Sequence, residues 1–160
     1  MAEKPRLDLF RSYVAAIENS VGTNLFRKMY FHIDGESIDV LDDGDLSCAV
    51  YVSAVLYLFG LIRELHTTVK ETVRDIQEKG WYEIKEPRKG ALILWDFAIK
   101  NTGTPGTNRH IGFYIDEHSA VSNSAKTKRV ELHPPGRPVT VDSDIDRKIL
   151  AYYWHDKLNA

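Results

Sequence analysis

The chain has 160 residues, of which 43% are hydrophobic and 28% are charged, and its formal net charge is −2. These values are typical of one globular domain and exclude a disordered, fibrous or repeat protein. The charge argues against a nucleic-acid partner, because proteins that bind a phosphate backbone usually carry a basic face. A single cysteine excludes an internal disulfide, and the scattered histidines lack metal-ligand spacing. We therefore expect no metal and no other cofactor.

No targeting signal is recognised in the sequence. The first residues, MAEKPRLDLF, lack the basic and apolar stretches of a secretory signal. The longest apolar run, residues 48–62, falls short of the ~20 residues that cross a bilayer. The sequence therefore predicts a protein that is cytoplasmic as encoded and has no membrane partner; phage-borne delivery and export by another route stay open. It does not indicate the oligomeric state.

Three helices are predicted in the first half of the chain. Residues 1–24 contain apolar side chains at helical spacing, and these predict an amphipathic helix that covers the rest of the fold. Residues 45–64 are apolar nearly all the way round, which predicts a helix buried on every side and capped by Asp45 or Ser47. Thr68 begins a capping box, which predicts a third, half-exposed helix that ends at Gly80.

The second half changes to short β-rich runs separated by turns. Six strands are predicted within residues 81–155: 81–84, 91–97, 110–115, 120–124, 129–133 and 149–154. Helices first and strands second indicate an α+β domain with an antiparallel sheet of about five or six strands. We therefore expect residues 1–160 to form one domain, with the buried helix packed on this sheet.

Cys48 stands in the first turn of the buried helix. The exposed amide hydrogens and the positive end of the helix dipole stabilise a thiolate there. The same amides, including that of Cys48 itself, can donate to the oxyanion formed when a carbonyl is attacked. Cysteine is also among the most buried residue types, so a packing role is the alternative explanation.

His110 begins the strand His-Ile-Gly-Phe-Tyr-Ile, where a strand end holds an imidazole rigidly. Gly112 lies on the same face and leaves room for another group to approach. A third residue is needed to orient the imidazole, and the next strand offers three candidates. A hairpin loop of even length places Asn123 diagonally beside His110, and we choose Asn123 as the third residue. A loop of odd length would place Ser122 or Ser124 there instead.

The order of these elements resembles the NlpC-type cell-wall peptidases of the papain-like superfamily. That family carries Asp-Cys-Ser-Gly at a helix N-terminus, then a Gly-Asp-Leu strand, and then a strand beginning His-Val-Gly-Ile-Tyr. This chain has Ser-Cys-Ala-Val at 47–50, Gly-Ala-Leu at 90–92 and His-Ile-Gly-Phe-Tyr at 110–114. The resemblance, over residues 25–132, implies a papain-like fold.

In function, the resemblance implies a cysteine peptidase that cleaves an amide bond in peptidoglycan stem peptides through a thioester. Cys48 is then the nucleophile, His110 the base, and Asn123 or Ser122 the third residue. The family's third residue is often a histidine at the position of Ser122, and Tyr30 is the nearest match to its oxyanion tyrosine. The altered neighbours of Cys48 support two alternatives, which are an inactive domain that binds peptides or proteins and an amidase or acyltransferase on the same scaffold.

Overall fold

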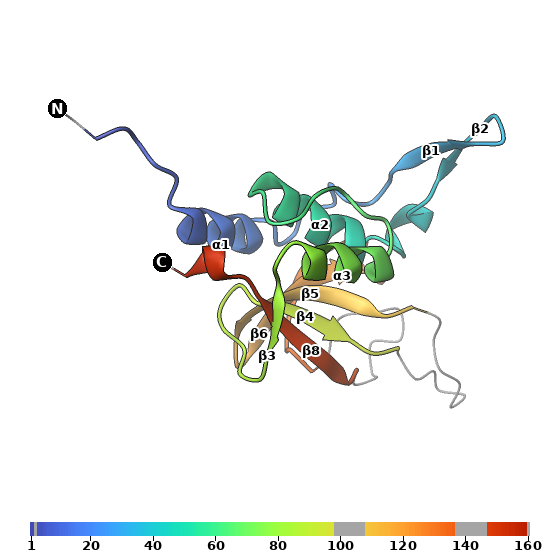
Figure 1. The fold of residues 1–160 in the computed structure, drawn as a ribbon. Coiled ribbons are helices and arrows are strands. Elements are labelled where there is room, and N and C mark those ends of the chain that lie inside the picture. The colour runs from blue at the N-terminus through green and yellow to red at the C-terminus, as the bar shows by residue number, and fades with distance from the viewer. Residues whose placement is uncertain (2, 98–107, 137–146, 160) are drawn as a thin grey trace.

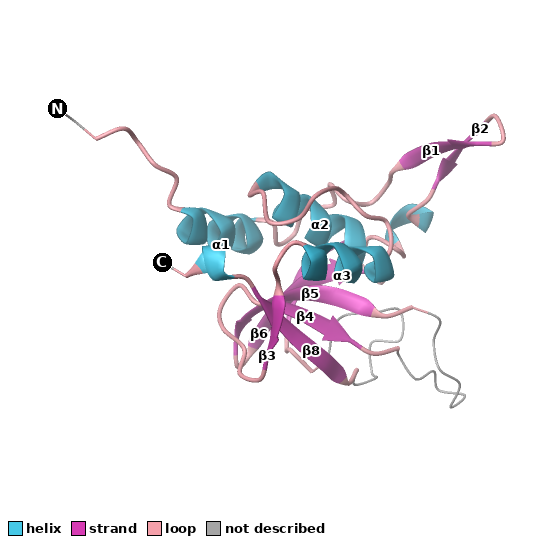
Figure 2. Ribbon diagram, viewed as in Figure 1, coloured by secondary structure: helices cyan, strands magenta, loops and turns pink. Residues whose placement is uncertain are grey.

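A computed structural model describes residues 1, 3–97, 108–136 and 147–159. The described part is an α+β arrangement of three α-helices and a six-stranded antiparallel sheet. Figures 1 and 2 show the helices on one side of this sheet. The mixed α+β class with an antiparallel sheet was therefore predicted correctly. Among the described residues, no helix has the length and apolar character that crossing a membrane requires.

The first helix, α1 (Leu9–Asn19), begins where Asp8 accepts a hydrogen bond from the Arg11 amide. Its buried face carries Tyr13, whose hydroxyl donates to the Gly90 carbonyl 2.8 Å away. This contact joins the N-terminal helix to the turn before the sheet. A helix that covers the fold was predicted within residues 1–24, and the observed helix is shorter.

Helix α2 (Cys48–Leu58) is the buried helix of the fold, and it is shorter than the predicted 45–64. The helix is capped at Phe59, and Gly60 follows with a φ of 65°. The last turn is buried on one side only, since Leu56 is fully buried whereas Tyr57 and Leu58 are 55% and 71% exposed. Ser47 occupies the N-cap position, but its side chain makes no capping bond.

Helix α3 (Val69–Glu78) begins at Thr68, whose hydroxyl oxygen accepts from the Glu71 amide. This bond confirms the predicted cap. Asp75, on its buried face, accepts from His66 at 2.7 Å and from the Arg63 and Glu64 amides. The carboxylate thereby ties the α2–α3 connection to the third helix.

The main sheet has the strand order β3-β8-β4-β5-β6-β7, and all its pairs are antiparallel. Its strands are β3 (Tyr82–Ile84), β4 (Leu92–Trp95), β5 (His110–Asp116), β6 (Ser119–Ser124), β7 (Arg129–His133) and β8 (Ile149–Trp154). Its helix-facing residues form the large core with α1 and α2. Ile93, Trp95 and Ala120 pack in a smaller cluster. Both apolar clusters centre on the four middle strands, β8, β4, β5 and β6.

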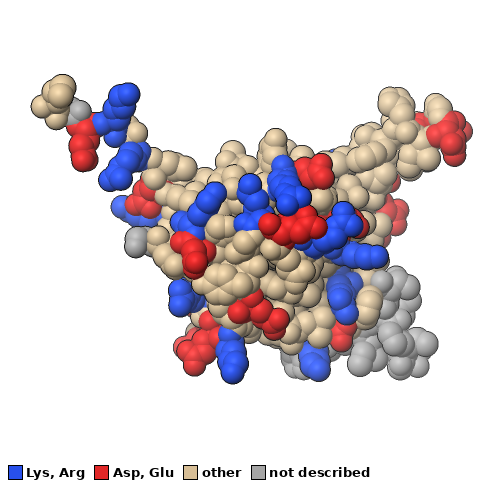
Figure 3. Space-filling view, in the orientation of Figure 1, with Lys and Arg blue, Asp and Glu red and all other residues tan. Residues whose placement is uncertain are grey.

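A separate hairpin of β1 (Tyr30–Ile33) and β2 (Glu36–Asp39) projects away from the body of the molecule (Figure 1). Short 3₁₀ turns follow it at Asp42–Gly44 and close the chain at Asp156–Leu158. On the described part of the face in Figure 3, positive and negative side chains are intermixed. This mixture agrees with the small net charge.

Candidate active site

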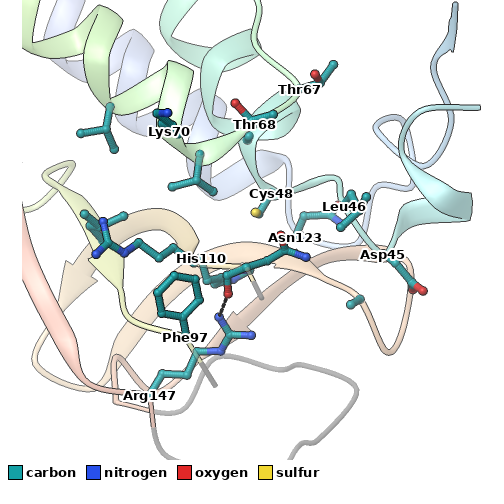
Figure 4. A pocket seen from close by; sticks show the side chains of 17 residues that line it. Asp45, Leu46, Cys48, Thr67, Thr68, Lys70, Phe97, His110, Asn123 and Arg147 are labelled. Atoms are coloured by element: carbon teal, nitrogen blue, oxygen red, sulfur yellow. Dashed lines mark hydrogen bonds between the residues drawn. The ribbon is translucent and has the colours of Figure 1, made fainter. Parts of the chain in front are cut away.

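Cys48 and His110 line one cavity of about 580 Å³ between α2, α3 and the ends of β4 to β6 (Figure 4). Apolar side chains from three elements form part of its wall, including Val69, Leu94 and Phe97. Cations also face it, among them Arg109 and Arg147. The structure thus brings the predicted nucleophile and base into one pocket.

The Cys48 sulfur is held at the helix N-terminus beside β5. The backbone N–H groups of Ile111, Ala49 and Cys48 face the sulfur and act to lower the thiol pKa. Burial nevertheless outweighs these amides and the Arg147 charge, so the net pKa of the thiol is raised above its usual value. The helix N-terminus by itself therefore does not supply the lowered pKa that the sequence predicted.

The His110 imidazole is buried, with 6% of the residue exposed. Its pKa lies well below the ordinary value, first because of burial, and then because of Arg147 and His133 nearby. The resting pair is therefore a neutral thiol and a neutral imidazole. A neutral imidazole is the form that can accept a proton.

Ser122 is the residue that contacts His110. Its Oγ lies 2.8 Å from the Nε2 atom of His110 and 2.7 Å from the Nε2 atom of His133. The preferred prediction, Asn123, is therefore wrong as a neighbour of His110, and the alternative with Ser122 is the one observed. The reason is a β-bulge: Tyr114 pairs with Ala120 and Asp116 with Ser119, which leaves Ile115 as an extra residue and reverses the parity.

Gly112 makes this contact geometrically feasible. A Cβ built on Gly112 would lie 2.6 Å from the Val121 carbonyl oxygen, 2.8 Å from the Ser122 Cβ and 3.1 Å from the Trp95 ring. The predicted opening beside the imidazole is present, and Ser122 occupies it. Only glycine fits between these two strands and the indole.

His133, at the end of β7, extends the hydrogen-bonded series. Its Nδ1 lies 2.9 Å from the Pro134 carbonyl oxygen, which can only accept, so Nδ1 carries the proton. Burial lowers the pKa of His133, and in the neutral ring Nε2 must then accept from the Ser122 hydroxyl. Ser122 in turn accepts from the His110 Nε2–H, which leaves His110 Nδ1 as the free base.

Trp95 supports both histidines. Its ring centroid lies 5.2 Å from that of His110 and 5.7 Å from that of His133, and its Nε1–H donates to the Pro135 carbonyl at 2.7 Å. The roles of His133 and Trp95 were not predicted from the sequence. The signal was a histidine followed directly by two prolines at a strand end, where the chain cannot continue the ladder.

Two other predicted residues lie elsewhere. Tyr30 is 59% exposed on the projecting hairpin and does not line the cavity, so its predicted oxyanion role is not supported by its position. Asn123 is buried and lines the cavity together with Cys48, but it makes no hydrogen bond to His110 (Figure 4). Its amide nitrogen faces the Gly44 carbonyl oxygen.

No protein-family model matches the sequence, and no curated protein matches it either.

Proposed function

We propose that this chain is a cysteine hydrolase of papain-like architecture that cleaves an amide bond. The observation that carries the proposal is the hydrogen-bonded series from His133 through Ser122 to His110, whose His110 end lines the cavity that also holds Cys48. The series leaves an unprotonated His110 Nδ1, and a nucleophile needs a base held in that way.

The reaction follows from the proton positions. His110 Nδ1 takes the thiol proton as the Cys48 sulfur attacks the amide carbonyl carbon, and the carbonyl oxygen becomes an oxyanion. The amides at the start of α2 can donate to this oxyanion. The imidazolium then gives its proton to the leaving nitrogen, the C–N bond breaks, and a thioester remains. Water attacks the thioester with His110 as base, which releases the acid and restores the thiol.

The neutral resting pair determines when the proton moves. Burial disfavours the separate thiolate and the separate imidazolium. Proton transfer is therefore coupled to attack, when the oxyanion provides a negative charge that balances the imidazolium. The base is ready at neutral pH because the His110 pKa is depressed.

Alkylation of Cys48 tests the proposal. Iodoacetamide labelling at pH 7 is expected to fall at least tenfold in His110→Ala, because positioned bases contribute roughly 10²- to 10⁴-fold. At pH 10 a larger fraction of the thiol ionises without a base than at pH 7, so the two proteins should label at closer rates if the fold is intact. His118→Ala is the matched control, since that side chain is 84% exposed and outside the cavity.

Equal labelling of the wild type and His110→Ala at pH 7, at a rate no faster than that of free cysteine, would contradict the hydrolase and favour a catalytically inactive binding domain. The substrate proposed from the NlpC-type resemblance is the peptidoglycan stem peptide. Incubation with muropeptides should release fragments heavier by one water in total, and Cys48→Ala should release none. Thioester substrates cleaved in preference to peptides would indicate an acyltransferase or thioesterase instead.

A further inference from the structure

Asn123 has a buried acceptor that nothing in the described protein satisfies. The residue is 2% exposed and lines the same cavity as Cys48 (Figure 4). Its Oδ1 atom has no hydrogen-bond partner among the described residues. Buried polar atoms are nearly always paired, so an unpaired acceptor beside a nucleophile needs an explanation.

The orientation of this amide is fixed by its surroundings. Nδ2 lies 3.5 Å from the Gly44 carbonyl oxygen, to which its N–H can donate. Turning the amide over would set Oδ1 against that carbonyl, with two acceptors facing each other. Oδ1 is therefore the atom left without a donor.

We propose that Asn123 Oδ1 accepts a hydrogen bond from a substrate N–H adjacent to the scissile carbonyl, on its acyl side. The inference rests on the proposed function and specifies its substrate class, which is a peptide-like acyl group that carries an N–H. Substrates in which this acyl-side N–H is replaced by an ester oxygen or carries an alkyl group lack the donor. They leave the buried oxygen unpaired, so they bind less well. Sites built around a buried hydrogen-bonding group discriminate strongly in this way.

The facing of the residues in β6 indicates which side of the substrate lies next to Asn123. Successive residues of β6 point to opposite faces, so Ser122 and Asn123 lie on opposite faces. Ser122 holds the base that must protonate the leaving nitrogen. The leaving group therefore lies towards His110, and the acyl portion is the part beside Asn123.

Two small aldehydes test this assignment, because aldehydes add reversibly to a cysteine thiol. N-acetylaminoacetaldehyde presents an amide N–H next to the reacting carbonyl, and acetoxyacetaldehyde replaces that N–H with an oxygen. Each is measured by how far it slows labelling of Cys48 by methyl methanethiosulfonate, which has no N–H group. Glutathione provides the baseline for the intrinsic difference between the two aldehydes.

The wild type should prefer the amide aldehyde about tenfold beyond the glutathione baseline, since one neutral hydrogen bond changes affinity by roughly that factor. Asn123→Ala should abolish the preference, with each labelling rate compared with the rate of the same variant in the absence of aldehyde. Asn108→Ala is the matched control, because Asn108 lines the same cavity with an exposed side chain. Asn123→Ser is a second variant if the alanine substitution prevents folding.

A wild-type protein without the preference, or an Asn123→Ala protein that keeps it, would overturn the assignment. The outcome is separable from the proposed function. If labelling of Cys48 depends on His110 but the protein shows no preference between the aldehydes, only the role of Asn123 is rejected. Cys48 labelling that does not depend on His110 rejects the hydrolase first.

Discussion

His133 sets the tautomer of His110 through a single hydroxyl group. It accepts from Ser122, so Ser122 has only lone pairs to offer His110, and the His110 proton must lie on Nε2. Without an acceptor at position 133, the Ser122 hydroxyl is free to donate to His110 Nε2. The His110 proton then moves to Nδ1, which is the atom needed as a base.

We accordingly expect His133→Leu to lower the His110-dependent labelling of Cys48 by about ten- to a hundredfold, as is usual when a partner that orients a reactive group is lost. His133→Gln keeps an acceptor oxygen and should restore much of the rate. The ¹⁵N chemical shifts of the His110 ring report its tautomer directly. A change of melting temperature in both variants with an unchanged His110 tautomer would show that His133 has only a structural role.

At the scale of the element, strand β5 carries both the base and the gap beside it. Gly112→Ala places a methyl group 2.6 Å from the Val121 carbonyl oxygen, which is backbone and cannot move aside cheaply. We expect the variant to lose about 1–3 kcal/mol of unfolding free energy, the usual cost of overpacking. It should also weaken labelling of Cys48, because the strands that carry His110 and Ser122 separate.

Urea denaturation of Gly112→Ala and Gly136→Ala measures this effect. The second variant is the control, since a Cβ at Gly136 meets nothing within 4 Å. Equal stability of the two variants would mean that the close approach of the strands at Gly112 is not maintained in solution.

The same strand explains why the third residue was mistaken. Alternation along β5 and β6 is visible in the sequence, but the parity between them depends on whether Ile115 bulges out of the ladder. Such a bulge depends on tertiary packing and leaves no local mark. The strands themselves were predicted well because turn residues separate each from the next, and β7 and β8 have the predicted bounds.

At the scale of the whole molecule, the buried histidines make folding sensitive to acid. His110 and His133 both have pKa values lowered by burial, whereas in the unfolded chain they titrate near 6.5. Above that pH neither the folded nor the unfolded chain binds these protons, so the two histidines do not reduce the unfolding free energy. As pH falls below it, the unfolded chain takes up protons first, so stability is lost by at most about 1.4 kcal/mol per pH unit for each histidine.

We therefore expect the unfolding free energy to decline between pH 7 and pH 5, before the carboxylates contribute. Urea denaturation over this range should give a shallower decline for His133→Gln than for the wild type, because one of the two buried imidazoles is gone. His118→Ala, at an exposed position, should leave the slope unchanged. Identical slopes for the wild type and His133→Gln would mean that His133 is not held neutral.

Long-range contacts limited what could be predicted about the site. Cys48 and His110 each stand at the start of an element with a readable pattern, a buried helix and an alternating strand. His133 reaches Ser122 only because β7 pairs with β6 so that Ala120 faces His133 and Ser122 faces Glu131 two residues before it. A diagonal contact of this kind depends on register, which a histidine in a short strand does not reveal.

The Ser122 hydroxyl also has an evolutionary consequence. It accepts a hydrogen bond from His110 only while it donates one to His133. A side chain at position 122 that carries its own acceptor would reach His110 directly and make His133 dispensable. Selection for this His110 tautomer therefore couples the two positions, and position 133 is expected to change only after position 122 has gained an acceptor of its own.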